Sequence, residues 1–196
     1  MATAAEEDPR SRSGGTTDVF LRGLTRWQGE QQRESVADLA VEAYRGDRGE
    51  EFRDRQEFLG RFTADTQRPG FEMALAGSVA GPVGCAYGFA MGREGDHWRG
   101  LLGDLPRQIE ELTASGQVFV IADLMVLPAN RRRGVGTALI ELLLSRCDAA
   151  LATAFVDPAN LSARAAFEAW HWTGTGRLQA DDAFPEREVW SRGLTA

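Results

Sequence analysis

Three consecutive arginines, Arg131, Arg132 and Arg133, come directly before a segment that contains Gly134 and Gly136. The apolar residues that follow are spaced as on one face of a helix over about 134–149. A helix N-terminus carries partial positive charge and normally attracts Asp or Glu, but this first turn contains neither. A bound anion would balance this positive charge. The free N–H groups of the first turn and the arginines can bind phosphate, and the glycines let the backbone come close to it. The pattern predicts a phosphate or pyrophosphate site; the alternative is a solvated basic loop before an ordinary helix.

Two common phosphate loops fit this segment poorly. The sequence contains no lysine, which excludes the Walker loop and also Schiff-base and pyridoxal phosphate chemistry. The dinucleotide fingerprint needs a third glycine where Leu139 stands, and it follows its strand directly, whereas 127–133 intervene here. Asp157 lies where an acid that binds ribose would be expected, although a turn residue in "DPAN" is the preferred interpretation. A dinucleotide-binding enzyme therefore stays as an alternative.

The elements that must position this loop follow from hydrophobic periodicity. Glycines 84 and 88 lie inside the second strand of a predicted hairpin, where they indicate bulges or close backbone approach. The strand at 117–128 is apolar on both faces and should be central. The strand–helix–strand order around it predicts a parallel pair with a crossover helix. The predicted strands are 18–24, 71–77, 82–92, 117–128, 152–156, 172–178 and 187–193; the predicted helices are 28–46, 50–67, 98–116 (helical at least after Pro106), 134–149 and 162–170.

Composition narrows the class of protein. The chain has 196 residues and a formal net charge of −7, which argues against a nucleic-acid-binding domain. No apolar run reaches the length of a membrane helix, and the N-terminus resembles no secretory signal. Two cysteines are too few for a disulfide framework or a metal cluster, so we expect a cytoplasmic protein without a metal site. We expect a disordered tail over 1–16 and a single domain over 17–196.

Two segments together resemble the acyl-CoA motifs of the GNAT superfamily of N-acetyltransferases. The first is R-x-x-G-x-G, with Arg131, Gly134 and Gly136, after a strand that reads "DLMVLP". The second, "NLSARAAFEAWHW", is similar to the N-x-x-A-x-x-x-Y/F segment of that family and begins at Asn160. The order of the elements also matches, so the resemblance spans about 18–192. It implies an α/β (α+β) fold: a central twisted, mixed sheet of about six to seven strands flanked by helices.

The resemblance also implies how acetyl-CoA would bind. The strands at 117–127 and 152–156 would splay apart and admit the pantetheine arm, which pairs with the backbone of the first strand. Asn160 would contact CoA near this arm. The expected cofactor-binding residues are Leu124, Met125, Val126, Arg131, Arg132, Arg133, Gly134, Val135, Gly136, Thr137 and Asn160.

The implied chemistry is direct attack of an amine on the thioester carbonyl, with a backbone N–H near Val126 stabilising the oxyanion. The family often has Glu where this chain has Ala122, and a tyrosine as general acid where it has Phe167. Asp123 is the substitute candidate base, because a carboxylate inside an apolar strand is costly unless it is partnered or used. A structural Asp bonded to neighbouring backbone is an equal alternative.

Two further side chains are weaker candidates for the site. Tyr87 could reach the site from the hairpin strand, although a core aromatic is the preferred interpretation. His97 could border an acceptor pocket, but we favour a surface histidine.

The predicted function is transfer of an acetyl group to a primary amine of a small molecule or peptide in a ternary complex. The predicted partners are this amine acceptor and no nucleic acid or membrane, in a monomer or homodimer. Because Ala122 and Phe167 replace the usual proton carriers, a non-catalytic acyl-CoA-binding module or sensor on the same fold is the main alternative.

Overall fold

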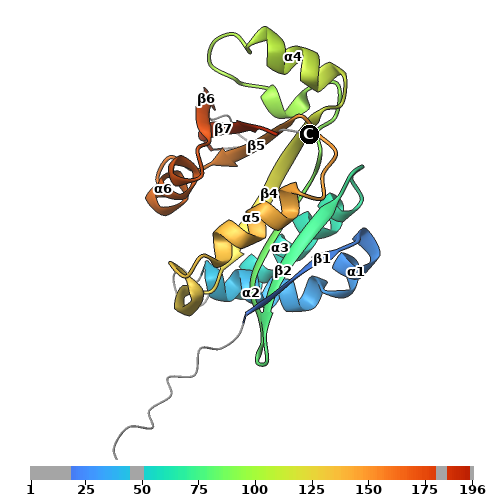
Figure 1. Ribbon diagram of the computed structural model, residues 1–196, viewed down its shortest axis with the longest axis vertical. Helices are drawn as coiled ribbons and strands as arrows, with labels where there is room; N and C mark the ends of the chain where they lie inside the picture. Colours follow the sequence, from blue (N-terminus) through green and yellow to red (C-terminus); the bar gives the residue numbers. More distant parts are fainter. Residues whose placement is uncertain (1–18, 45–50, 180–184, 195–196) are drawn as a thin grey trace, which may run out of the picture.

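The computed structural model describes residues 19–44, 51–179 and 185–194. The tail predicted at 1–16 lies outside the described residues, as does the end of the helix predicted over 28–46. Seven strands form one sheet in the order β1-β2-β3-β4-β5-β7-β6 (Figure 1). The strands are β1 (Phe20–Leu24), β2 (Glu72–Ser78), β3 (Gly81–Ala90), β4 (Val118–Val126), β5 (Leu151–Val156), β6 (Thr173–Leu178) and β7 (Arg187–Gly193). The helices are α1 (Arg26–Gln31), α2 (Arg33–Ala43), α3 (Glu51–Thr66), α4 (Arg107–Ala114), α5 (Val135–Leu144) and α6 (Leu161–Ala169), with short 3₁₀ turns η1 (Asp96–Trp98) and η2 (Pro128–Asn130).

The sheet topology confirms the predicted centre of the fold. β4 is the middle strand, and its pairing with β5 is parallel, whereas the other pairs of named strands are antiparallel. The predicted crossover helix, α5, connects the parallel pair. The mixed α/β fold class expected from the sequence is therefore confirmed.

Helices cover both faces of the sheet. On one face, α5 packs close to β2 and β3, where the inward residues are small: a Cβ on Gly84 would lie 3.0 Å from Leu139 and 3.3 Å from Val135. On the opposite face, α2 and α3 bury Met73, Leu75 and other large side chains. The connection between β3 and β4, which carries η1 and α4, covers the same face farther along, over β4, β5 and β7. This second face is thus divided between two hydrophobic clusters, one under α2 and α3 and one under α4.

Three predicted helices differ from the structure in their extent. The segment 28–46 forms two helices, because Thr25 caps α1 and the chain turns at Gln32 before α2 begins. In 98–116 only α4 is a regular α-helix, after Pro106, since Gly100 and Gly103 have φ of 81° and 90°. α5 ends at Leu144, five residues before the predicted end at 149. None of the helices within the described ranges is both long and apolar enough to cross a bilayer.

Candidate acyl-donor and proton-transfer site

β4 and β5 separate partway along their length. Their parallel pairing runs from Val118 opposite Leu151 to Ile121 opposite Ala154 and then stops. β4 nevertheless continues to Val126, and β5 to Val156. The splay that the resemblance implied is therefore present, over residues 122–126 of β4.

The backbone of β4 beyond this point faces the opening at alternate residues. The N–H of Leu127 donates to the carbonyl of Val83 on β3 at 2.9 Å. In an antiparallel ladder the exchange of hydrogen bonds recurs at every second residue, so Met125 also pairs with β3. Leu124 and Val126 consequently direct their amides to the side that β5 has left. Of the three residues expected to pair with pantetheine, the geometry favours these two and not Met125.

A β-bulge lies where the two strands separate. Tyr87 of β3 is opposite Asp123, but Gly88 is opposite Ile121, so Ala122 is an extra residue in β4. A Cβ on Gly88 would lie 2.2 Å from the Val120 carbonyl oxygen, which shows the close backbone approach predicted for this glycine. The bulge turns two successive side chains to one face: Ala122 packs against the clusters under α3 and α4, and Asp123 contacts residues of the α2–α3 side.

Asp123 is the carboxylate at the bulge, and both of its oxygens have partners. The Tyr44 hydroxyl donates to Oδ1 at 2.7 Å, and the Arg61 guanidinium donates to Oδ2 at 3.2 Å. The carboxylate is only 9% exposed, and burial raises its pKa against the opposing effects of Tyr44 and Arg61. Asp123 is thus a partnered, buried carboxylate that favours its protonated form more than a free aspartate does.

Tyr44 and Arg61 were not identified as site residues from the sequence. The Tyr44 hydroxyl also donates to the carbonyl of Leu124 at 3.1 Å, so it reaches the open stretch of β4 from the end of α2. Desolvation of the hydroxyl and the neighbouring Asp123 raise the pKa of Tyr44, so the phenol stays protonated and acts as a donor. Neither contact has a local sequence signal, because 79 residues separate Tyr44 from Asp123 and 62 separate Arg61 from it.

Tyr87 lies in the core, as the preferred interpretation predicted. Its ring is fully buried and packs edge-on against Phe62, with centroids 5.0 Å apart. Its hydroxyl is enclosed without a hydrogen-bond partner among the described residues. Burial raises its pKa well above the ordinary value. Apart from the position of Tyr87 opposite Asp123, no feature of the described residues supports a catalytic role for it.

The start of α5 has the geometry of an anion site. Arg132 and Gly134 both have left-handed backbone, with φ of 60° and 79°. The first intrahelical bond is from the N–H of Ala138 to the Gly134 carbonyl, so the amides of Val135, Gly136 and Thr137 have no helical partner. The first turn contains no acidic residue. Successive free amides beside a left-handed turn form a concave group of donors that suits phosphate oxygens.

The three arginines have different roles in this loop. Arg131 turns back and donates to the carbonyls of Val126 at 3.0 Å and Ala43 at 2.6 Å, so its side chain fixes the loop to β4 and α2. The side chains of Arg132 and Arg133 are exposed and form no ion pair with any described residue. These two guanidinium groups and the amides of Arg132 and Arg133 are therefore available for an anion, whereas the Arg131 N–H donates to the Pro128 carbonyl at 3.3 Å.

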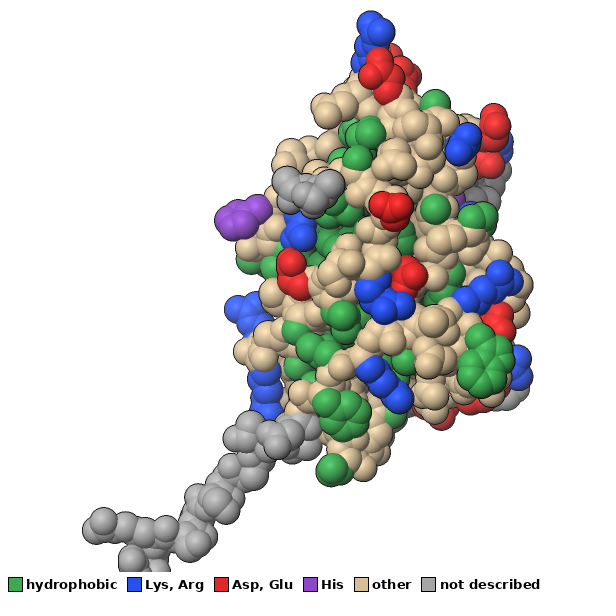
Figure 2. All heavy atoms as spheres, turned by 45° about the vertical axis from the view of Figure 1, so that its right-hand side comes forward, with side chains coloured by type: hydrophobic (Ala, Val, Ile, Leu, Met, Phe, Trp, Pro, Cys, Tyr) green, Lys and Arg blue, Asp and Glu red, His purple; other side chains and the backbone are tan. Residues whose placement is uncertain are grey.

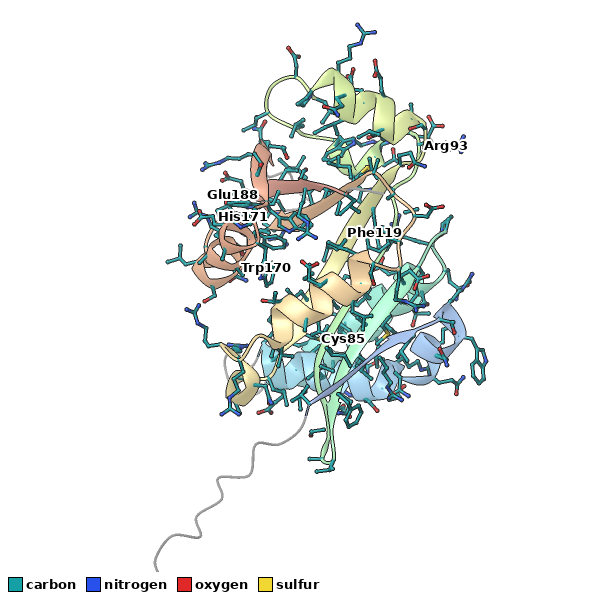
Figure 3. The ribbon with its side chains drawn as sticks, viewed as in Figure 1. Cys85, Arg93, Phe119, Trp170, His171 and Glu188 are labelled. Atoms are coloured by element: carbon teal, nitrogen blue, oxygen red, sulfur yellow. The ribbon has the colours of Figure 1, made fainter. Side chains whose placement is uncertain are left out.

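The second predicted motif borders the same opening. Asn160 caps α6, its side chain accepting from the N–H of Ala163 at 3.0 Å. At the other end of α6, the Trp170 indole donates to the Thr137 hydroxyl at 2.9 Å and lies beside the position of a Cβ on Gly136. Figure 3 shows Trp170 between α6 and α5. The side chain of Phe167, where a tyrosine was expected, is buried among Trp170, Trp172 and Trp190.

The dinucleotide alternative does not fit this structure. The Asp157 carboxylate accepts from the Ala159 N–H at 2.8 Å, as expected of a turn residue. The η2 turn lies between β4 and the glycine loop, and the sheet is mostly antiparallel rather than doubly wound. Both features differ from the dinucleotide-binding arrangement.

The prediction of a surface histidine at position 97 is wrong. The ring lies between Phe89 and Phe155, with centroid distances of 5.8 and 6.0 Å, and its Nδ1 is enclosed without a partner among the described residues. Burial, followed by the charge of Arg68, lowers its pKa. The error arose because the connection from β3 to β4 packs onto the sheet instead of looping into solvent.

Two hollows in the structure lie away from this opening. One, of about 420 Å³, lies beside β6 and β7 and is lined by Arg164, Glu188 and Trp190 among others; Figure 3 labels Glu188. The other, of about 520 Å³, lies between α1, α2 and α3, and its lining includes Glu34 and Phe62. Within the described residues, no group of three or more His, Cys, Asp or Glu side chains is placed to hold a metal ion.

Comparison with solved structures places the fold among acetyltransferases. A protein from Desulfovibrio desulfuricans, described as an acetyltransferase of the GNAT family, has a TM-score of 0.61 at 14% identity, covering 91% of this chain and 100% of its own. The ribosomal-protein-S18-alanine N-acetyltransferase of Escherichia coli has a TM-score of 0.60 at 11% identity, covering 91% and 96%. The PaiA N-acetyltransferase of Thermoplasma acidophilum, solved in complex with coenzyme A, has a TM-score of 0.59 at 8% identity, covering 90% and 99%.

Comparison by sequence gives the family. No curated protein matches the chain as a relative. The model of the acetyltransferase (GNAT) family, however, matches residues 33–172, which include α2, β4, the glycine loop and α6. The chain therefore belongs to the GNAT family of acetyltransferases.

Proposed function

We propose that the protein transfers an acetyl group from acetyl-CoA to a primary amine of a small molecule or peptide, by direct attack in a ternary complex. Acetyl-CoA is the co-substrate, because the chain belongs to an acetyltransferase family and its fold recurs in a structure that holds coenzyme A. The observation that carries the proposal is the alignment of three features along β4: the strand opening, the outward amides of Leu124 and Val126, and the free amides at the start of α5.

The donor side of the proposed site needs no side-chain chemistry. The diphosphate would accept hydrogen bonds from the amides of Val135, Gly136 and Thr137, with Arg132 and Arg133 adding charge. The pantetheine arm would lie in the opening along Leu124 and Val126. Tyr44 and Arg131 already donate to the carbonyls of these two residues, and the Leu124 N–H also interacts with the Asp123 carboxylate, so the N–H of Val126 is the proposed backbone donor to the arm.

The reaction would be addition of the amine to the thioester carbonyl, followed by loss of CoA as a thiolate. The N–H of Val126 is the proposed donor to the developing oxyanion, because it faces the opening and the strand holds it rigid. Holding both substrates in one opening supplies much of the rate enhancement. The amine must lose a proton, and the thiolate must gain one.

Of the two predicted roles for Asp123, we assign the structural one. A base must be free to take the substrate proton, but both oxygens of this carboxylate already accept hydrogen bonds. We infer that Asp123 positions Tyr44 and Arg61, and that Tyr44 in turn holds the Leu124 carbonyl. Both are positioning roles that fix the shape of the opening.

Steady-state measurement of thiol release tests the proposal. The protein would be incubated with acetyl-CoA and, in turn, spermidine, kanamycin A or a hexapeptide with a free N-terminus. We expect release well above the hydrolysis rate with at least one of these amines, and an acetylated product by mass spectrometry. Saturable acetyl-CoA binding without acetylation of any of the three would instead favour the acyl-CoA-binding module, which the buried Phe167 leaves as the second candidate.

A further inference from the structure

The connection between β3 and β4 brings a histidine to the point where β4 and β5 separate. η1 lies in this connection, and His97 is its middle residue. The ring contacts Phe89 on β3 and Phe155 on β5, with centroids 5.8 and 6.0 Å away. Phe155 directly follows Ala154, the last residue of β5 that pairs with β4. The two rings therefore fix the imidazole beside the end of the paired region.

The imidazole lies on the face of the sheet opposite to the anion site. Phe89 belongs to the hydrophobic cluster under α4, against which Phe155 also packs, whereas α5 covers the other face. Ala122 packs against both the cluster under α4 and the cluster under α2 and α3, so it marks the boundary between them. A CoA thioester held at α5 would enter the opening from one face, and an acceptor could reach the thioester from the face of His97.

Near this boundary, the Tyr87 hydroxyl and the Nδ1 atom of His97 are enclosed without a hydrogen-bond partner within the described residues, but burial raises the pKa of Tyr87 well above its ordinary value. Asp123 is bound by Tyr44 and Arg61. Asp65 is buried and paired with Arg68 at 3.4 Å. Of these groups, the imidazole is the one without a hydrogen-bond partner that can exchange a proton near neutral pH.

The charges around the imidazole favour its neutral form. Burial is the main cause that lowers its pKa. Arg68, two residues after α3, lowers it further, and its guanidinium lies 4.5 Å from the Phe89 ring. Asp96, on the same turn, opposes this effect but is paired with Arg99 at 2.7 Å. A neutral imidazole at physiological pH can accept a proton, as a general base must.

We propose that His97 is the general base that removes the proton from the acceptor ammonium group. The proposal rests on the proposed acetyl transfer. His97 takes one proton from R–NH₃⁺, and the amine nitrogen then forms a bond to the thioester carbonyl carbon. As the tetrahedral intermediate collapses, the C–S bond breaks, its electron pair leaves with the CoA sulfur, and the second amine proton passes to that thiolate. The imidazolium returns its proton to solvent, which leaves the N-acetyl product, CoA and one proton.

Kinetics of His97→Gln test the proposal, with His171→Gln as the matched control because the other histidine is exposed and outside the site. With the amine that wild type acetylates, His97→Gln should lower kcat about 100-fold or more. Its Kd for acetyl-CoA should stay within threefold of wild type. The pH profile of kcat should lose the acidic limb that wild type and His171→Gln retain. A kcat within threefold of wild type and an unchanged acidic limb would overturn the proposal while leaving acetyl transfer established.

The location of His97 can be tested without turnover. The chain has two histidines, so His171→Gln assigns both imidazole Cε1–H signals in a ¹H–¹³C NMR spectrum. Titration with acetyl-CoA should shift the His97 signal. If acetyl-CoA binds and the His97 signal does not move, the imidazole is not at the thioester and the proposal fails. The same titration identifies a His97→Gln variant that has lost its fold, because such a variant would lose the dispersion of its spectrum.

Discussion

At the scale of single residues, the proposed site contains a carboxylate in a buried position, where a charged group is ordinarily unfavourable. Asp123 is a carboxylate in a nearly enclosed position, with a pKa raised mainly by burial. Folding therefore favours the protonated form of this group more than the unfolded chain does. The stability that Asp123 contributes is then greatest below its ordinary pKa and is lost as the pH rises through its folded value.

Comparison with Asp123→Asn across pH tests this consequence. From about pH 4 upward, the free energy of unfolding of wild type should decrease relative to that of Asp123→Asn, which cannot ionise. Urea denaturation of both proteins at a series of pH values from 4 to 8 gives the difference. A difference that stays constant, or that moves in favour of wild type as the pH rises, would contradict the raised pKa.

His171 has an unfavourable backbone conformation. It follows the last residues of α6 with φ of 59°, in the left-handed region that glycine adopts without cost. His171→Gly should therefore raise the free energy of unfolding by about 0.5–1 kcal/mol. The control His171→Gln, which keeps the strain, should change it little. Urea midpoints measure both, and a destabilised His171→Gly would show that the imidazole has a stabilising contact.

At the scale of elements, two glycines at the start of α5 should differ in their effect on stability but not in their effect on CoA binding. Gly134 has φ of 79°, so Gly134→Ala should cost about 1–2 kcal/mol of stability although space for the Cβ is open. Gly136 lies within the helix, where a Cβ would make ordinary contacts with Trp170 and Val126 at 3.7 Å or more. Gly136→Ala should therefore be neutral or stabilising by up to about 1 kcal/mol.

Both substitutions should weaken CoA binding, because each changes the approach to the free amides of this turn. We expect at least tenfold higher Kd values for CoA by calorimetry, and nearly unchanged binding of acetylpantetheine, which lacks the diphosphate. A stable Gly136→Ala protein that binds CoA as tightly as wild type would show that the diphosphate does not approach this turn.

The C-terminal strands depend on a buried carboxylate. Glu188 of β7 is 7% exposed and forms ion pairs with Arg164 of α6 at 2.9 Å and Arg177 of β6 at 3.4 Å. Glu188→Gln removes the counter-charge of Arg164 and leaves Arg177 with Glu186 alone, and it should cost about 1–3 kcal/mol. The loss should be visible as a lower urea midpoint, with acetyl-CoA affinity per folded molecule unchanged. An unaltered midpoint would indicate that solvent already screens both pairs.

The motif helix and its strand could be predicted from sequence because their signals are local. The run from Val118 to Val126 is apolar except for Asp123, and Gly134 and Gly136 lie at the start of the helix. The contacts of the Arg131 side chain could not be predicted, because its partners are backbone carbonyl groups, which every residue has. The bulge at Ala122 depends on pairing with Gly88, and only this glycine gave a local sign of it.

At the scale of the whole molecule, the hydrophobic cluster under α2 and α3 and the cluster under α4 lie on the same face of the sheet. They meet at Ala122, next to the opening between β4 and β5. Figure 2 shows charged groups of both signs interspersed with apolar side chains on one face of the protein. The contacts of Tyr44, Arg61 and His97 with this boundary arise only when α2, α3 and η1 pack on the sheet. Sequence patterns predict such elements, but the side chains that meet between them are determined by packing.

The most direct test of the proposed function is isothermal titration calorimetry of the 196-residue chain with acetyl-CoA. We predict saturable heat at a stoichiometry of one, with a Kd in the micromolar range and an affinity that falls as salt is added, because Arg132 and Arg133 contribute charge. At a ligand concentration about 100 times the Kd, the same binding should stabilise the fold by about 2.7 kcal/mol. Absence of both heat and stabilisation at millimolar acetyl-CoA would contradict the assignment of the opening along β4 as the acyl-donor site.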